Sequence, residues 1–143
     1  MDRNRTLFES RGEEHRIRDC HGDLHIEHIC LADGIVIFDC IEFNERFRFG
    51  DVAAEVAFLA MDLEERGRAD YAHRLLNRYL EASGDYGGLP LLAFYTVYRA
   101  LVRAKVAAIR ASQEDPAGRL TDLASRDQYL ALSLIHISEP TRP

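Results

Sequence analysis

Three polar side chains of this sequence, Asp23, His28 and Asp39, are spaced as phosphoryl-transfer chemistry requires. That chemistry needs one carboxylate that orients the attacking hydroxyl and accepts its proton, and further ligands that hold Mg²⁺ against the phosphates. Asp23 lies in a short polar segment, residues 19–23, that is typical of a loop. His28 is a candidate metal ligand, and Asp39 follows a pair of apolar segments. Because two neighbouring carboxylates repel each other, this arrangement predicts a divalent cation between them.

A β-hairpin is predicted to bring the two aspartates together. The apolar segments 29–31 and 35–38 are rich in β-branched residues and flank an Asp-Gly pair at residues 33–34. Such a pair between two apolar segments is a strong local signal for a hairpin. Since a hairpin returns the chain to its starting point, we expect Asp39 to lie beside Asp23. The phosphoryl-transfer interpretation depends on this geometry.

The rest of the chain is predicted to be mainly helical, which gives an α+β fold with one hairpin. Apolar residues recur with helical spacing after Asp51, which is placed to cap a helix, and a long apolar stripe over 91–109 predicts a buried helix. Glycine and proline mark the breaks between these segments. The expected helices cover residues 2–17, 51–67, 75–83, 90–109 and 120–130.

The composition is that of one soluble globular domain and excludes several classes of function. The 143 residues carry a formal net charge of −6, which argues against a nucleic-acid partner because phosphate binding needs clustered Lys and Arg. Cys20, Cys30 and Cys40 form no C-x-x-C pair, so reduced thiols are expected. The chain shows no signal peptide, and its apolar stretches are too short to span a bilayer. We therefore expect a cytoplasmic protein without a membrane partner.

The segment 132–143 is expected to fit no structural element. Its apolar residues have no consistent period, and its end is polar and broken by proline. The sequence L-S-L-I-H-I-S-E-P-T-R resembles the translation of a common transposase sequencing adapter, and each residue matches one successive codon of the adapter. We therefore predict that residues 132–143 are a non-native tail, and we assign no function to His136.

A family resemblance is carried by the segment H-G-D-L-H from His21, by F-D-C-I-E-F-N from Phe38, and by D-V-A-A-E-V-A-F-L from Asp51. Together these motifs resemble the C-terminal lobe of aminoglycoside-phosphotransferase-like, protein-kinase-like enzymes. In particular, the chain is similar to bacterial proteins that join such a kinase module to a P-loop ATPase domain. The resemblance spans about residues 4–129, within an expected kinase-like domain of residues 1–131.

The resemblance implies a role for each candidate residue. Asp23 corresponds to the catalytic base, with His21 beside it in the catalytic loop, where its ring is expected to hold the loop. Asp39 corresponds to the Mg²⁺ ligand of the Asp-Phe-Gly type, and His28 stands where such kinases usually have a metal-binding Asn. Asp51 resembles the aspartate that supports the catalytic loop from a helix start, although a simple helix-terminal charge remains an equal interpretation.

The resemblance implies an ATP- and Mg²⁺-dependent phosphotransferase that acts on a hydroxyl of a small polar molecule. The sequence contains no G-x-G-x-x-G, and its single lysine, Lys105, follows the catalytic loop, so the nucleotide-gripping lobe is expected to be missing and the fragment to be inactive. Two alternatives remain open. One is a catalytically dead nucleotide-binding or regulatory module attached to an ATPase domain. The other is a metal-dependent hydrolase that uses His21, His25 and His28.

Overall fold

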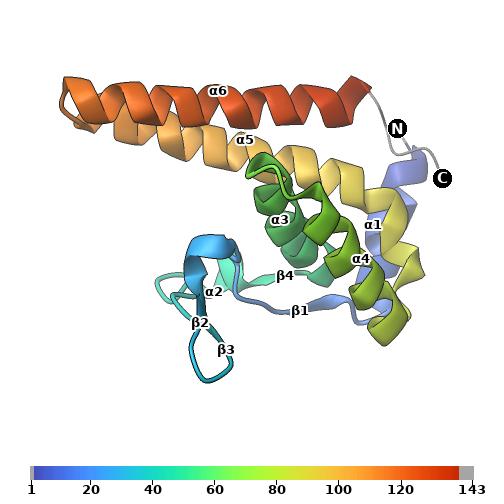
Figure 1. The fold of residues 1–143 in the computed structure, drawn as a ribbon. Coiled ribbons are helices and arrows are strands. Elements are labelled where there is room, and N and C mark those ends of the chain that lie inside the picture. Colours follow the sequence, from blue (N-terminus) through green and yellow to red (C-terminus); the bar gives the residue numbers. More distant parts are fainter. Residues whose placement is uncertain (1, 139–143) are drawn as a thin grey trace.

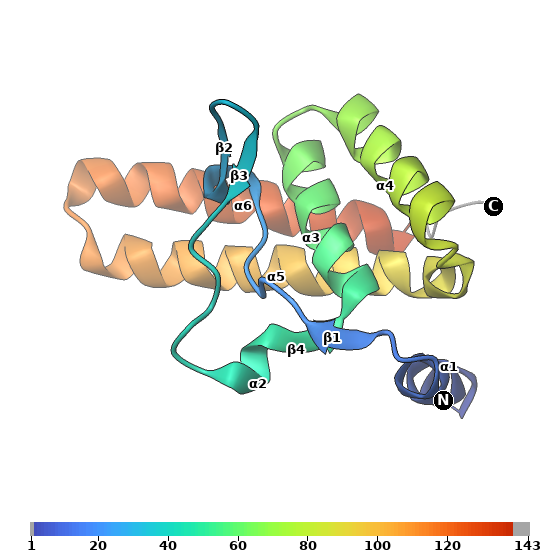
Figure 2. The same ribbon diagram turned by 90° about the horizontal axis from the view of Figure 1, so that it is seen from below.

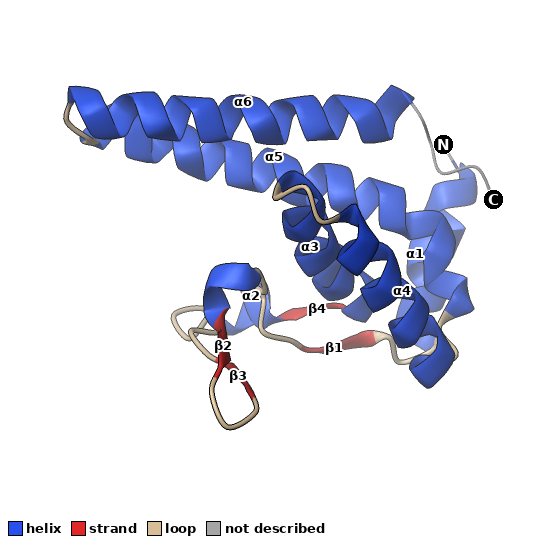
Figure 3. Cartoon of the chain, in the orientation of Figure 1, coloured by secondary structure: helices blue, strands red, loops and turns tan. Residues whose placement is uncertain are grey.

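The structure, a computed structural model, describes residues 2–138 and is built mainly of helices (Figure 3). This confirms the expected mainly helical α+β fold. Its helices and strands are α1 (Asp2–Glu13), β1 (Ile17–Asp19), β2 (Ile29–Leu31), β3 (Ile35–Ile37), α2 (Glu45–Arg48), β4 (Phe49–Asp51), α3 (Val52–Glu65), α4 (Ala69–Ser83), α5 (Leu89–Gln113) and α6 (Pro116–Ser138), with 3₁₀ turns at Ile26–His28 and Tyr86–Gly88. None of the described helices combines the length and apolar character that crossing a membrane requires.

Helices α3 to α6 form the body of the molecule (Figure 1). Helices α5 and α6 run antiparallel and side by side, while α3 packs against both α4 and α5. Their shared core consists of Phe58 and Met61 from α3, Ala100 and Ala104 from α5, and Tyr129 from α6. The small alanine side chains leave room for the larger rings at close-packed density.

The apolar stripe that was expected to bury α5 is only partly buried, so this expectation needs correction. Phe94 and Tyr98 remain about half exposed, whereas alanines form most of the buried face of the helix. The reason lies in the close approach of α3 and α6, which the alanine face permits and a face of large side chains would prevent. Tertiary packing therefore selects a different face from the one that the aromatic residues mark.

The strands form two small antiparallel sheets, one of which is the predicted hairpin. In the hairpin, Ile29 of β2 faces Ile37 of β3, and the backbone N–H of Phe38 donates to the carbonyl of His28 at 3.1 Å. The hairpin extends away from the helical body (Figure 1), and the view from below looks onto it (Figure 2). The second sheet pairs β1 with β4, with Ile17 opposite Asp51, and was not predicted.

The first helix is shorter than expected. It was predicted to reach residue 17, but α1 ends at Glu13, and His15 turns the chain with a φ of 55°. Ile17 then joins β1, where it pairs with β4. The strand pairing supplies hydrogen bonds that a longer helix would have supplied, and it brings α1 next to the start of α3.

The expectation that residues 132–143 fit no structural element is corrected for the described part of that segment. Helix α6 continues to Ser138, with Leu132 packed against the core and Ser133 buried. The Nε2 atom of His136 lies 2.7 Å from the carboxylate of Glu64 on α3. Packing along α3 and α5 thus supports a helix that the local pattern did not indicate. Residues 139–143 lie outside the described residues, and the adapter origin of the segment stays a prediction.

Candidate active site

Gly22 fixes the start of the predicted catalytic loop. Its φ of 84° is left-handed, and a Cβ atom here would lie 2.9 Å from the carbonyl oxygen of Phe47. Its N–H donates to both carboxylate oxygens of Glu55, at 3.1 and 3.2 Å, and its carbonyl accepts from Arg99 at 3.0 Å. Glycine is thus required both by the backbone conformation and by the space. The loop is held between α3 and α5, which supply these two side chains.

Helix α3 holds the loop at a second point. The N–H of Ile26 donates to the carboxylate of Asp62 at 2.9 Å, and Asp62 is fully buried. Glu55 and Asp62 are seven residues apart, so they lie two turns apart on one helix face. Burial raises the pKa of Glu55, while the charge of Arg99 and the Gly22 hydrogen bond oppose that rise. Neither anchor was predicted from the sequence.

Asp51 caps α3 and belongs to a buried network. Its carboxylate accepts from the N–H of Ala53 at 2.9 Å, which is the geometry of an N-cap. It also accepts from Arg11 of α1 at 2.6 and 2.8 Å and from the Tyr95 hydroxyl at 3.0 Å. The contact with the loop that the resemblance suggested for Asp51 is made instead by Glu55.

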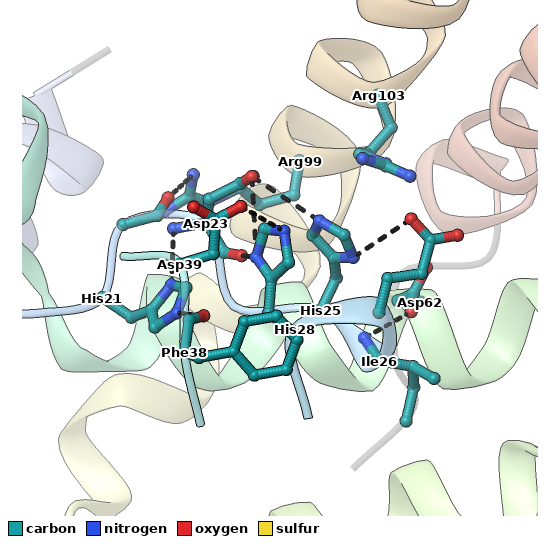
Figure 4. Close-up of polar contacts among 12 residues, drawn as sticks. His21, Asp23, His25, Ile26, His28, Phe38, Asp39, Asp62, Arg99 and Arg103 are labelled. Carbon is teal, nitrogen blue, oxygen red and sulfur yellow. Dashed lines mark hydrogen bonds and ion pairs between the residues drawn. The ribbon is translucent and has the colours of Figure 1, made fainter. Parts of the chain in front are cut away.

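Asp23, the predicted base, follows Gly22 and lies beside two histidines (Figure 4). Its Oδ2 atom is 3.5 Å from Nε2 of the buried His25 and 3.9 Å from Nδ1 of His28. The hydrogen bond with His25 holds the pKa of Asp23 below its ordinary value, against the opposing effect of burial. The positive charge of Arg103 lowers the pKa of Asp23 further. The carboxyl is therefore ionised at neutral pH.

Replacing His25 by phenylalanine is expected to raise the pKa of Asp23, because the ring stays buried but its N–H is lost. In the native protein the folded pKa lies below the unfolded one. The interaction therefore stabilises the fold at neutral pH and is lost as the pH falls through the folded pKa. A ¹³C NMR titration of the Asp23 carboxyl measures this shift. His73→Phe, at an exposed position on α4, is the control and should leave the titration unchanged.

His28 lies between the two aspartates that the hairpin was predicted to bring together (Figure 4). Its Nδ1 atom is 2.9 Å from the backbone carbonyl of Asp23, and its Nε2 atom is 3.3 Å from Oδ2 of Asp39. Asp39 has a left-handed φ of 62°, a conformation that aspartate adopts more readily than most residues. The loop and the segment after the hairpin therefore meet at one imidazole.

His21 connects the same two segments from the other side. Its Nε2 atom lies 2.7 Å from the carbonyl of Phe38, which only accepts, so Nε2 carries the proton. Its Nδ1 atom then accepts from the N–H of Asp23 at 3.4 Å. The hydrolase alternative would use His21, His25 and His28. Among the described residues, the group whose side chains lie close enough to share one ion is Asp23, His25 and His28.

An open cavity of about 710 Å³ lies in front of these residues. Asp23 and Asp39 both line it, so the two residues border the same space. The segment that follows Asp39 forms the remaining wall, including Glu42 and Phe43. The cavity is large enough for a small polar molecule together with part of a second ligand.

Comparison with known proteins decides the family. Residues 3–95 match the sequence model of the family described as phosphotransferase enzyme family. The chain belongs to the phosphotransferase enzyme family. It is also 40% identical over 137 residues to uncharacterized proteins of Mycobacterium tuberculosis and Mycobacterium bovis, which covers 95% of this chain but only 27% of each relative. No solved structure matches the chain significantly.

Membership in the phosphotransferase enzyme family confirms the resemblance seen in the sequence. The helical body with its single hairpin agrees with the C-terminal lobe of a kinase-like fold. The matched region contains His21, Asp23, His28, Asp39 and Asp51. All of the predicted site residues thus lie in the part of the chain that is shared with the family.

A phosphotransferase is expected to work with Mg²⁺, and this site fits that ion only in part. Mg²⁺ prefers oxygen ligands in octahedral geometry, and the exposed carboxylate of Asp39 meets this preference. The second position offers the imidazole nitrogen of His28, which suits transition-metal ions better. Asp39 and His28 together therefore differ from an all-oxygen Mg²⁺ site.

Proposed function

We propose that the protein transfers the γ-phosphoryl group of ATP to a hydroxyl of a small polar molecule, with the help of a divalent cation. The observation that carries this proposal is the meeting of Asp23 and Asp39 at one cavity, with His28 between them. Phosphoryl transfer rests on positioning and charge stabilisation and needs few reacting side chains. The residues that face the cavity are of the types that these two tasks require.

Asp23 is proposed to act as the base. Its lowered pKa keeps the carboxylate ionised at neutral pH, so it can orient the acceptor hydroxyl and take its proton as the oxygen attacks phosphorus. The Gly22 clamp and the His21 ring hold the backbone at Asp23, and His25 contacts its carboxylate. Asp39 is proposed to hold the cation, which when bound neutralises negative charge on the phosphates.

The remaining parts of the nucleotide site are proposed to lie elsewhere in the full-length protein. Lys105 lies on α5, downstream of the catalytic loop, and no glycine-rich motif occurs in the 143 residues. A separate lobe would supply the glycine-rich loop and lysine that grip ATP. By the same resemblance, a covalently linked P-loop domain is a proposed partner, and the cytoplasm is the proposed compartment.

Replacing Asp39 by asparagine is expected to lower the rate of phosphoryl transfer at least about a hundredfold, because several kcal/mol of charge stabilisation is lost with the metal ligand. The assay follows ADP release by the intact protein with a panel of hydroxylated acceptors, and ³¹P NMR identifies a phosphomonoester product. Asp33→Asn, at the exposed tip of the hairpin, is the matched control and should retain the wild-type rate.

Two results would contradict the proposal. One is an unchanged rate of product formation in Asp39→Asn. The other is tight binding of ATP by the wild-type protein without turnover of any acceptor, which would favour the catalytically dead module.

A further inference from the structure

The hydrogen bonds of His28 leave one ring nitrogen directed at Asp39. Its Nδ1 atom lies 2.9 Å from the Asp23 carbonyl, which only accepts, so Nδ1 carries the proton. In the neutral ring, Nε2 then holds a lone pair, and this atom is 3.3 Å from Oδ2 of Asp39. Metal-binding histidines commonly donate their second ring N–H to a carbonyl or carboxylate in this manner. The orientation of the ring is therefore that of a metal ligand.

The separation of the two atoms also suits a shared ion. Nitrogen and oxygen ligands that each lie about 2.1 Å from one ion are about 3.0 to 3.4 Å apart in octahedral or tetrahedral geometry. The distance between Nε2 of His28 and Oδ2 of Asp39 falls within this range. The Asp39 side chain is largely exposed and lines the cavity, so an ion and its remaining ligands have access.

We propose that Nε2 of His28 and Oδ2 of Asp39 form a mixed nitrogen and oxygen site that selects a first-row transition dication over Mg²⁺. The inference concerns the cation of the proposed phosphotransferase and rests on that function for its role. Its physical basis is ligand type, since imidazole suits ions such as Co²⁺ and Zn²⁺, whereas Mg²⁺ favours oxygen. Asp23 remains outside the ligand pair and keeps its carboxylate for the acceptor hydroxyl.

Binding of Co²⁺ to the intact protein, without ATP or acceptor, tests this site. Proton NMR of the Co²⁺ form is expected to show a hyperfine-shifted, exchangeable signal from the Nδ1–H of His28, which is protected by its bond to Asp23. In His28→Asn this signal disappears. Equilibrium dialysis is expected to show that the preference for Co²⁺ over Mg²⁺ falls at least about tenfold in the same variant. His25→Phe serves as the second variant and should retain the signal.

Several outcomes would overturn the inference. A wild-type protein without the exchangeable signal would mean that the contact of His28 with Asp39 is an ion pair only. Loss of the signal in both His25→Phe and His28→Asn would place the ion among Asp23, His25 and His28 instead. An unchanged metal preference in His28→Asn would remove the selective role of the histidine. Because turnover is not measured, these results are separate from those that test the phosphotransferase proposal.

Discussion

Replacing Asp23 by asparagine is expected to lower kcat for phosphoryl transfer by about 10²- to 10⁴-fold, the usual contribution of a general base. The amide keeps the size of the carboxylate and still accepts from His25, but it does not take a proton from the acceptor hydroxyl. The KM for ATP should change little, because Asp23 is proposed to act on the acceptor. Steady-state kinetics of the intact protein with the best acceptor from the panel measures both constants.

The Asp33→Asn variant again provides the comparison, since it removes one carboxylate from an exposed turn outside the cavity. Circular dichroism and thermal melting establish that both variants are folded. If Asp23→Asn kept a kcat within a fewfold of that of Asp33→Asn, Asp23 would not be the base, and the assignment of the loop would be wrong.

Replacing Arg11 by alanine is expected to lower the free energy of unfolding by about 3–5 kcal/mol, because buried carboxylates lose their partner. Arg11 is 1% exposed and contacts Asp51 and Asp85 through its guanidinium group. The hydroxyls of Tyr79 and Tyr95 complete this network, at 2.6 Å from Asp85 and 3.0 Å from Asp51. The network joins α1 to the start of α3 and to the segment that connects α4 with α5. Urea-induced unfolding followed by circular dichroism measures the loss.

Arg5→Ala is the matched control on the same helix. Arg5 pairs with Glu9 at the surface, and its side chain is 80% exposed, so its removal should change the free energy of unfolding by no more than about 0.5 kcal/mol. Equal effects of the two substitutions would show that the buried network contributes little and that α1 is held by other contacts.

The hairpin and the meeting of Asp23 with Asp39 were predictable because their signals are local. An Asp-Gly pair between two β-branched segments specifies the turn, and the turn alone returns Asp39 to the neighbourhood of the loop. Helix α3 and the end of α4 were predictable for a similar reason, because the Asp51 cap and the glycines lie beside an apolar repeat. The start of α4 at Ala69, with no side-chain cap, lies before the predicted residue 75. Local sequence signals were therefore enough to predict the hairpin and the position of Asp39 near the loop.

What the sequence did not reveal depends on partners that are distant along the chain. Ile17 forms a strand rather than a helix because it pairs with Asp51, and such short strands have little local signature. Glu55 and Asp62 bind backbone N–H groups of the loop, and a backbone donor has no residue type that a pattern can mark. The available signal for Asp62 was an acidic residue among the apolar residues of a predicted helix.

The clamp on Gly22 has a consequence for how the proposed reaction begins. With the N–H of Gly22 bonded to Glu55 and its carbonyl bonded to Arg99, the two peptide groups that flank Gly22 are tethered to two packed helices. The backbone that carries Asp23 is therefore fixed before any ligand binds, and the contact with the buried His25 orients the carboxylate. The entropic cost of ordering the proposed base has therefore been met during folding. Less of the acceptor's binding energy is then needed to reach the reacting geometry.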